Sequence, residues 1–164
     1  MPELPEVEIV KRGLARALEG RVIDSLIYTR PNLRYPLPPT LPGLITGRKI
    51  KSLQRRGKYI IALSDGGDGF ILHLGMSGVI KIIPPGEDYT PIKHDHVILT
   101  LQGGGQIILH DPRRFGFLRQ CHRDNWESDI AFATMGVEPL GNEFNEDVLG
   151  KSLEGRGSSI KGAV

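Results

Sequence analysis

The feature that most constrains the fold is a series of short apolar segments separated by glycine- and proline-containing turns. Turn sequences such as Asp65-Gly66-Gly67 and Gly103-Gly104-Gly105 lie between these segments. Short apolar runs bounded by turn signals are typical of β-strands. Many such strands at near-regular spacing favour a sandwich or a barrel. We therefore predict a mainly β protein with an N-terminal α-helix, folded as a two-layered β-sandwich or flattened barrel.

The predicted elements follow from apolar periodicity. Apolar residues of the first segment recur at helical steps: Val7, Val10, Leu14 and Leu18. They predict a helix over residues 5–18 that Gly20 terminates. The predicted strands are 22–28, 49–54, 59–63, 70–74, 79–83, 97–101, 106–109 and 115–119. The proline-rich segment 31–42 is predicted as a loop, with Tyr35 packed onto the core.

The length of 164 residues suits one domain with a true core. We assign residues 1–135 to the sandwich domain and residues 136–164 to a linker with a short helical segment. The single cysteine, Cys121, excludes an internal disulfide framework and any multi-cysteine zinc site within this chain. No apolar run approaches the length of a membrane span, and the charged N-terminus does not resemble a signal peptide. The expected location is therefore the cytoplasm, with nucleoid association.

Positive charge is concentrated in one stretch, although the net charge is only +2. The cations of this stretch, with no acidic residue among them, are Arg48, Lys49, Lys51, Arg55, Arg56 and Lys58. Such a run gives nucleic acid an electrostatic footprint. It is also typical of a solvated face or a protected sheet edge. Both interpretations stay open from charge alone.

The N-terminus carries a possible nucleophile. Pro2 follows Met1, and removal of the methionine would leave a secondary amine. An α-amino group titrates near pH 8, so a useful fraction is unprotonated at neutral pH. It can attack an electrophilic carbon and form an iminium ion, and the carboxylate of Glu3 stands beside it for proton transfer. The alternative is that Pro2 and Pro5 only start a helix.

Two turns carry side chains suited to a disrupted base stack. Met76 lies within the glycine-flanked segment 75–78, and segment 111–116 combines two arginines with Phe115. An exposed apolar side chain can enter a base stack, and arginine with an aromatic ring can occupy the space of an extruded base. The alternatives are a buried methionine, and a loop in which Asp111 pairs with an arginine while the aromatic ring anchors the core.

Histidines offer a competing hypothesis. His94 and His96 alternate and could face one side of a strand, where His110 could join them. No carboxylate follows at a helpful metal-ligand interval, and such histidines are more often structural or phosphate-facing. A small-ligand or metal-binding sandwich built on these three residues remains the alternative class of function.

Five segments together resemble the formamidopyrimidine-DNA glycosylase family, bacterial enzymes that remove oxidised purines from DNA. In chain order these are Met1-Pro2-Glu3-Leu4-Pro5-Glu6-Val7-Glu8, Arg55-Arg56-Gly57-Lys58-Tyr59, His73-Leu74-Gly75-Met76-Ser77-Gly78, Lys93-His94-Asp95-His96-Val97 and Asp111-Pro112-Arg113-Arg114-Phe115-Gly116. The resemblance extends to about Lys161. It implies a two-layered sandwich with the N-terminal helix laid against it.

The resemblance also implies roles. Pro2 would attack C1′ of the damaged nucleotide, Glu3 would donate and accept protons, and Lys58 would contact the neighbouring phosphate and support catalysis. Met76, Arg113 and Phe115 would fill the gap left by the flipped base, with Arg113 facing the estranged cytosine. The implied DNA-binding set is Arg55, Arg56, His73, Met76, His94, His96, Arg113, Arg114 and Phe115. No metal ligand is expected in this set.

The implied function is base-excision DNA repair. A bifunctional glycosylase and abasic-site lyase would excise 8-oxoguanine and formamidopyrimidines through a proline Schiff base and nick the strand by β,δ-elimination. The expected partner is double-stranded DNA with oxidised purines or abasic sites, bound by a monomer. Family members continue into a helix–two-turn–helix unit and a four-cysteine zinc ribbon that are absent here, so no cofactor is expected in this chain. The alternative is a truncated, non-catalytic relative that binds DNA weakly.

Overall fold

The computed structural model describes residues 2–129 and 132. The chain divides into two compact units, residues 1–126 and 127–164. The second unit is described at residues 127–129 and 132, where a 3₁₀ turn (Trp126–Ser128) crosses the boundary. The linker and helical segment predicted for residues 136–164 lie outside the described residues. The domain boundary at residue 135 therefore stays a prediction.

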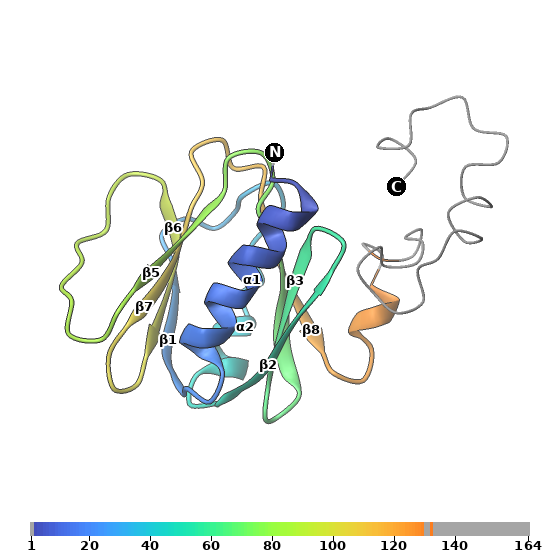
Figure 1. Cartoon of the computed structure of the whole chain (residues 1–164), viewed down its shortest axis with the longest axis horizontal. Helices are drawn as coiled ribbons and strands as arrows, with labels where there is room; N and C mark the ends of the chain where they lie inside the picture. The colour runs from blue at the N-terminus through green and yellow to red at the C-terminus, as the bar shows by residue number, and fades with distance from the viewer. Residues whose placement is uncertain (1, 130–131, 133–164) are drawn as a thin grey trace, which may run out of the picture. The chain divides into compact units, whose positions relative to one another are not determined.

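The first unit contains two four-stranded antiparallel sheets (Figure 1). The first sheet has the order β1-β6-β7-β5, and the second has the order β2-β3-β4-β8. The strands are β1 (Ile23–Tyr28), β2 (Ile50–Arg56), β3 (Tyr59–Ser64), β4 (Asp68–His73), β5 (Val79–Ile83), β6 (Asp95–Leu101), β7 (Gln106–His110) and β8 (Phe117–His122). The predicted mainly β, two-layered sandwich with one N-terminal helix is confirmed.

The N-terminal helix α1 (Leu4–Leu18) begins one residue earlier than predicted. Its start is fixed by a capping box, in which the Glu3 N–H donates to Glu6 Oε2 at 3.0 Å. The buried face consists of Val7, Leu14 and Leu18. The helix contacts β2 and β3 of one sheet and β5 of the other. Strands β2 and β5 are edge strands of the two sheets, so the helix covers one edge of each sheet, as Figure 1 shows.

A second helix, α2 (Leu41–Ile45), follows the proline-rich loop and was not predicted. Leu41 and Ile45 are fully buried, and the helix contacts β1 and β4, one strand from each sheet. Tyr35 is 48% exposed, so the prediction that it packs onto the core is wrong; its ring meets Phe117 edge-on at 5.7 Å. Proline earlier in the segment obscured the short helix because it weakens helical periodicity.

The core between the sheets is apolar and nearly filled. One void of about 40 Å³ lies among side chains that include Phe70, Leu72 and Leu99. All of its lining residues are apolar, so it offers no polar group that could orient a substrate or react with it. A functional site within residues 2–129 must therefore be sought on the loops around the sandwich. None of the helices in this part of the chain is long and apolar enough to cross a membrane.

Candidate nucleic-acid interface and reaction corner

The predicted catalytic residues meet at one corner of the sandwich. Pro2 immediately precedes Glu3, the N-cap of α1. The Glu3 carboxylate lies 3.6 Å from Lys58 Nζ, and both side chains remain partly exposed, at 46% and 33%. Lys58 lies in the two-residue β2–β3 turn, where Gly57 adopts a φ of 60° that favours glycine. Folding thus places Pro2, whose nitrogen becomes a free amine once Met1 is removed, next to a carboxylate and near an ammonium group.

The two arginines before this turn differ in exposure. The Arg55 side chain is only 4% exposed, with Nε 3.5 Å from Glu8 Oε1, and Nη1 donates to the Gly57 carbonyl at 2.9 Å. Arg56 is partly exposed. The remaining cations of the basic run begin at the opposite end of β2, where Lys49 bridges to Val22. With about 3.3 Å per residue, these ends are roughly 20 Å apart, so the run is not one compact patch.

Two loops extend beyond the same end of the second sheet. Residues 75–78 follow β4, and residues 111–116 connect β7 to β8. Met76 is 47% exposed and Phe115 39% exposed, so the alternatives in which they are core residues are wrong. The Arg113 guanidinium lies 5.1 Å from the centre of the Phe115 ring. An apolar, a cationic and an aromatic side chain are thus presented to solvent.

A buried carboxylate ties these two loops together. Asp111 is fully buried and accepts hydrogen bonds from Ser77 Oγ at 2.7 Å, the Arg114 N–H at 3.2 Å and the Gly116 N–H at 2.8 Å. The Ser77 hydroxyl in turn accepts from the Arg113 N–H at 3.2 Å. The alternative in which Asp111 pairs with an arginine side chain is therefore replaced by pairing with backbone and hydroxyl donors. The sequence signal for this arrangement was an aspartate at the start of a turn, where its side chain can accept hydrogen bonds from the backbone N–H groups that follow.

The backbones of the two loops also approach closely. A Cβ atom on Gly75 would lie 2.4 Å from the Gly116 nitrogen and from the Phe115 carbonyl carbon. Gly75 has a φ of 63°, which other residues rarely adopt. No larger residue fits at position 75 without moving the second loop. The positions of Met76 and Phe115 are therefore mechanically linked.

His73 lies between the reaction corner, which consists of Pro2, Glu3 and Lys58, and the loops 75–78 and 111–116. It is buried, its ring stacks on Phe117 with centroids 5.2 Å apart, and its Nδ1 accepts the Gly75 N–H at 3.0 Å. Burial lowers the pKa of His73, and the positive charges of Lys58 and Arg34 lower it further. The imidazole is thus neutral at neutral pH, with Nδ1 as acceptor. Its contacts are internal, whereas a DNA contact remains a prediction.

His94 and His96 do not alternate along one strand as predicted. His94 precedes β6 with a φ of 73°, and the register shifts between Asp95 and Val97. The His94 ring nevertheless lies 5.9 Å from that of His96 and 6.1 Å from that of His110. No group of three or more metal-binding side chains in the described part of the chain is arranged to hold an ion. The cluster therefore does not support the metal-site alternative.

His96 itself faces inward. It is 6% exposed, and its Nε2 lies 2.9 Å from the Asp111 carbonyl oxygen. Burial lowers the pKa of His96, with a smaller opposing effect from that carbonyl. The Thr29 hydroxyl and N–H reach the backbone carbonyls beside it. His96 thus joins β1 to the 111–116 loop.

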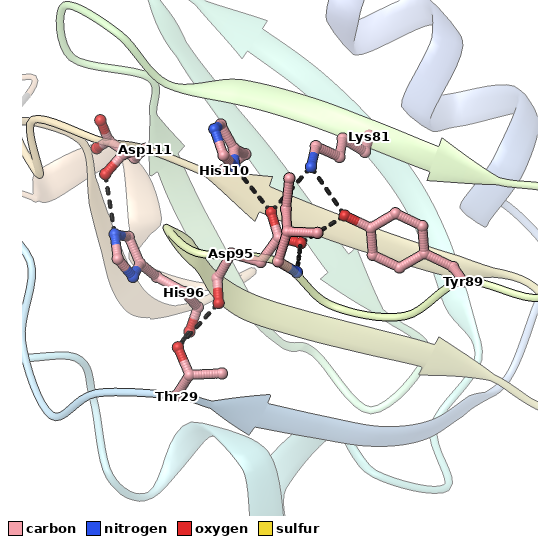
Figure 2. A network of polar contacts seen from close by, with 8 residues as sticks. Thr29, Lys81, Tyr89, Asp95, His96, His110 and Asp111 are labelled. Carbon is pink, nitrogen blue, oxygen red and sulfur yellow. Dashed lines mark hydrogen bonds and ion pairs between the residues drawn. The ribbon is translucent and has the colours of Figure 1, made fainter.

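Asp95 forms a second buried centre, drawn in Figure 2. Its side chain is fully buried, and the donors around it are Lys81 Nζ at 3.0 Å, His110 Nδ1 at 2.8 Å, the Ile92 N–H at 2.9 Å and the Tyr89 hydroxyl. Burial alone would raise the pKa of Asp95, but these hydrogen bonds outweigh burial and hold it well below its ordinary value. Asp95 therefore anchors the 84–94 loop. Sequence reasoning missed it because Lys81 and His110 come from other strands, 14 and 15 residues away in the chain.

The register of the second sheet places the corner and the loops at one end. Tyr59 pairs with His73, and His73 pairs with Phe117. Lys58, the 75–78 turn and the end of the 111–116 loop adjoin these three residues in sequence. This end can supply an amine nucleophile, a proton-transferring carboxylate, cations for phosphate and exposed side chains for a disrupted base stack.

Residues 1–118 match the family described as "Formamidopyrimidine-DNA glycosylase N-terminal domain". Formamidopyrimidine-DNA glycosylase of Methylocella silvestris is 44% identical over an alignment that covers all of this chain and 59% of that protein. The enzyme of Azorhizobium caulinodans is 43% identical with the same coverage. The chain thus spans about three fifths of the length of these relatives.

Solved structures of two DNA complexes resemble the fold of this chain. The complex of Lactococcus lactis Fpg with DNA containing an abasic site superposes with a TM-score of 0.85 at 31% identity, covering 98% of this chain and 59% of that one. MutM in complex with DNA containing carbocyclic 8-oxo-G gives a TM-score of 0.80 at 32% identity, covering 93% and 57%. With the matched family domain, the sandwich and the sequence relatives, these findings show that the chain belongs to the formamidopyrimidine-DNA glycosylase family.

Proposed function

We propose that this chain is the catalytic portion of a base-excision repair enzyme that removes oxidised purines and cleaves the strand. The observation that carries the proposal is the reaction corner, where Pro2 adjoins Glu3 and the Glu3 carboxylate lies 3.6 Å from Lys58 Nζ. Its substrates would be duplexes with 8-oxoguanine, formamidopyrimidines or abasic sites. The family membership and the DNA complexes of its relatives support this assignment.

The chemistry needs the free Pro2 amine. After removal of Met1, its nitrogen lone pair attacks C1′, and the damaged base departs with the bonding electrons and takes up a proton. The proline nitrogen, positively charged after the attack, loses its proton, and its lone pair then expels the ring oxygen, which leaves an iminium ion between the proline nitrogen and C1′. Glu3 would deliver the proton to the ring oxygen. Because proline is a secondary amine, the nitrogen of the iminium ion carries no hydrogen, and the Schiff base stays cationic.

The same intermediate explains strand cleavage. The iminium ion acidifies the C2′ proton, and loss of that proton expels the 3′-phosphate by β-elimination. A second elimination expels the 5′-phosphate, and water then releases the sugar fragment from Pro2. Lys58 would hold the neighbouring phosphate during these steps, since an ammonium group binds phosphate as a point charge. One amine thus serves both glycosylase and lyase reactions.

The two loops would hold the damaged nucleotide outside the duplex. Met76, Arg113 and Phe115 are exposed and held by the buried Asp111. Flipping a base costs a few kcal/mol, and side chains that occupy the vacated space offset that cost. His94, Arg56 and Arg114 would contribute phosphate contacts, which position the duplex without reading its sequence.

Zinc has no assigned role in this scheme. The four-cysteine ribbon of the family cannot be built from Cys121, which is buried and the only cysteine in the sequence. The residues of the reaction corner are an amine, a carboxylate and an ammonium group, and none of the proposed steps requires a metal.

Borohydride trapping tests the proposal. The methionine-trimmed chain would be incubated with duplexes that carry 8-oxoguanine opposite cytosine or an abasic site, then reduced. We expect a covalent adduct on both. It should be strongly reduced in a variant that retains the initiator methionine, which makes the Pro2 nitrogen part of a peptide bond, and in Pro2→Gly, which leaves a primary amine in place of the secondary one. The matched control is Pro5→Ala, which changes the next proline but leaves the N-terminus intact.

The same experiment addresses the alternative, a non-catalytic relative that binds DNA weakly. Trapping on the abasic site alone would support lyase chemistry and contradict base excision by this chain. No adduct on either duplex, with cooperative unfolding retained, would overturn the catalytic assignment in favour of weak binding.

A further inference from the structure

A largely buried ion pair joins the two elements that form the reaction corner, helix α1 and the β2–β3 hairpin. Glu8 projects from the second turn of α1, the helix that begins at Glu3. Arg55 projects from β2, immediately before the turn that carries Lys58. Glu8 Oε1 and Arg55 Nε are 3.5 Å apart, and the side chains are 18% and 4% exposed.

The arginine also reaches the turn. Its Nη1 donates to the Gly57 carbonyl at 2.9 Å, while Nε faces Glu8. One planar guanidinium therefore contacts the helix and the backbone directly before Lys58. Guanidinium has several donors in a rigid fork, so it can fix two groups at once, which an ammonium group cannot do in the same way.

Glu8 gathers further charge on the helix surface. Its Oε2 lies 3.3 Å from Lys11 Nζ and 3.8 Å from Arg12 Nε. The Arg12 side chain is 69% exposed, whereas the Arg55 side chain is only 4% exposed and its Nε is shielded from solvent. Electrostatic interactions are stronger where water is excluded. The interaction of Glu8 with Arg55 is therefore the one suited to fixing geometry, and that with Arg12 is a surface contact.

We propose that Glu8 and Arg55 are a positioning pair that holds the N-terminus of α1, with Pro2 and Glu3, at its working distance from Lys58. This inference rests on the proposed function, because the distance matters only if those residues react with DNA. It also assigns Arg55 a different role from the phosphate contact implied by the family resemblance. Glu8 and Arg55 act through other residues and do not touch the reacting atoms.

Single-turnover trapping at saturating DNA separates positioning from binding. We expect Glu8→Gln and Arg55→Gln each to slow Schiff-base formation by about 10- to 100-fold, as misplacement of reacting groups by about 1 Å does. The dissociation constant for a duplex with an uncleavable tetrahydrofuran abasic analogue should change by less than about twofold. The double variant should be no slower than the slower single variant, since one contact is lost in each case. Arg55→Lys should be intermediate.

Arg12→Gln is the matched control. It removes one positive charge from the same carboxylate on an exposed side chain, and both the rate and the DNA affinity should stay at wild-type values. A Glu8→Gln variant that traps at the wild-type rate would overturn the proposal. So would an Arg55→Gln variant that lowers the salt dependence of DNA binding by about one released counterion, because that result identifies a phosphate contact.

Amide hydrogen exchange tests the pair without any chemistry. We expect Glu8→Gln, a change on α1, to accelerate exchange at Gly57 and Tyr59 in the hairpin. We expect Arg55→Gln, a change on β2, to accelerate exchange at Val7 on α1, and Arg12→Gln to do neither. Exchange confined to the substituted element would contradict the proposal. If the wild-type chain forms no Schiff base yet shows this cross-element exchange, the proposed function fails while the structural link stands.

Discussion

The reaction corner and the loop pair (residues 75–78 and 111–116) lie at the same end of one sheet, yet their central groups differ in exposure to solvent. The corner joins Glu3 and Lys58, which are 46% and 33% exposed, across 3.6 Å. The loop pair is organised around Asp111, which is fully buried and accepts three hydrogen bonds. Reacting groups must reach a substrate, whereas the groups that position them gain strength from exclusion of water.

Substitutions in the two regions should therefore differ in their effects on stability and on activity. Substitutions at the buried centres should cost folding free energy because they leave donors without acceptors. Substitutions at the corner should cost little stability, because exposed ion pairs contribute about 0–1 kcal/mol. Similar losses of folding free energy on substitution in the two regions would contradict this contrast.

The largest expected loss of stability is for Asp111→Ala. It leaves the Gly116 and Arg114 N–H groups and the Ser77 hydroxyl without their acceptor, which should lower the free energy of unfolding by roughly 4 kcal/mol. Urea unfolding at pH 7 measures it. Asp124→Ala is the control, because Asp124 is 75% exposed and should change stability by less than about 0.5 kcal/mol. A difference under about 1 kcal/mol between the two would contradict the role of Asp111.

The next largest effect is expected for Gly75→Ala. Its φ of 63° and the 2.4 Å approach to Gly116 should together cost about 3 kcal/mol. Gly86→Ala isolates the backbone contribution, since Gly86 has a φ of 85° but open space around its Cβ position, and should cost about 1 kcal/mol. Thermal unfolding of both variants provides the comparison. Equal losses would show that the loops do not press on each other.

A smaller effect links the two regions through His73. Because folding lowers its pKa below 6.5, the unfolded chain binds a proton that the folded chain does not. His73 therefore contributes stability that is present above about pH 6.5 and lost as the pH falls through the folded pKa. Stability of His73→Gln should depend less on pH between 7 and 5. In an NMR titration, Lys58→Gln should raise the His73 pKa; an unchanged value would show that corner and loops are electrostatically independent.

The smallest effect on stability is expected at the corner itself. Glu3→Gln and Lys58→Gln should each change the free energy of unfolding by less than about 1 kcal/mol. Trapping by Glu3→Gln should nevertheless slow by about 100-fold or more, as expected for a lost proton-transfer group. A variant as unstable as Asp111→Ala would remove the contrast between the regions.

Local patterns predicted most of the fold. The strand at residues 79–83 has the predicted bounds, and α1 differs by one residue. These elements were accessible because apolar periodicity and turn residues are local signals. Helix α2 was missed because the prolines of segment 31–42 indicated a loop. The alternation of His94 and His96 failed because His94 lies outside the strand, next to a register shift that no local signal marks.

The site was less accessible to sequence reasoning. The family pattern named Glu3, Lys58 and the loop residues, and the structure brings Glu3 and Lys58 together. The contacts that hold these residues were not predicted from the sequence. Glu8 and Arg55 are far apart in the chain, and so are Ser77 and Asp111. The family resemblance placed Arg55 in the DNA-binding set, whereas its side chain is 4% exposed. Burial depends on tertiary packing, which a run of cations does not encode.

The identity of the attacking group is the central claim of this account, and mapping the trapped adduct tests it most directly. The methionine-trimmed chain would be reduced with borohydride on abasic-site DNA, digested with nuclease and protease, and analysed by mass spectrometry. We predict that the sugar-fragment mass is found on the N-terminal peptide that begins with Pro2. An adduct on the peptide that contains Lys58, with an unmodified N-terminal peptide, would contradict the account.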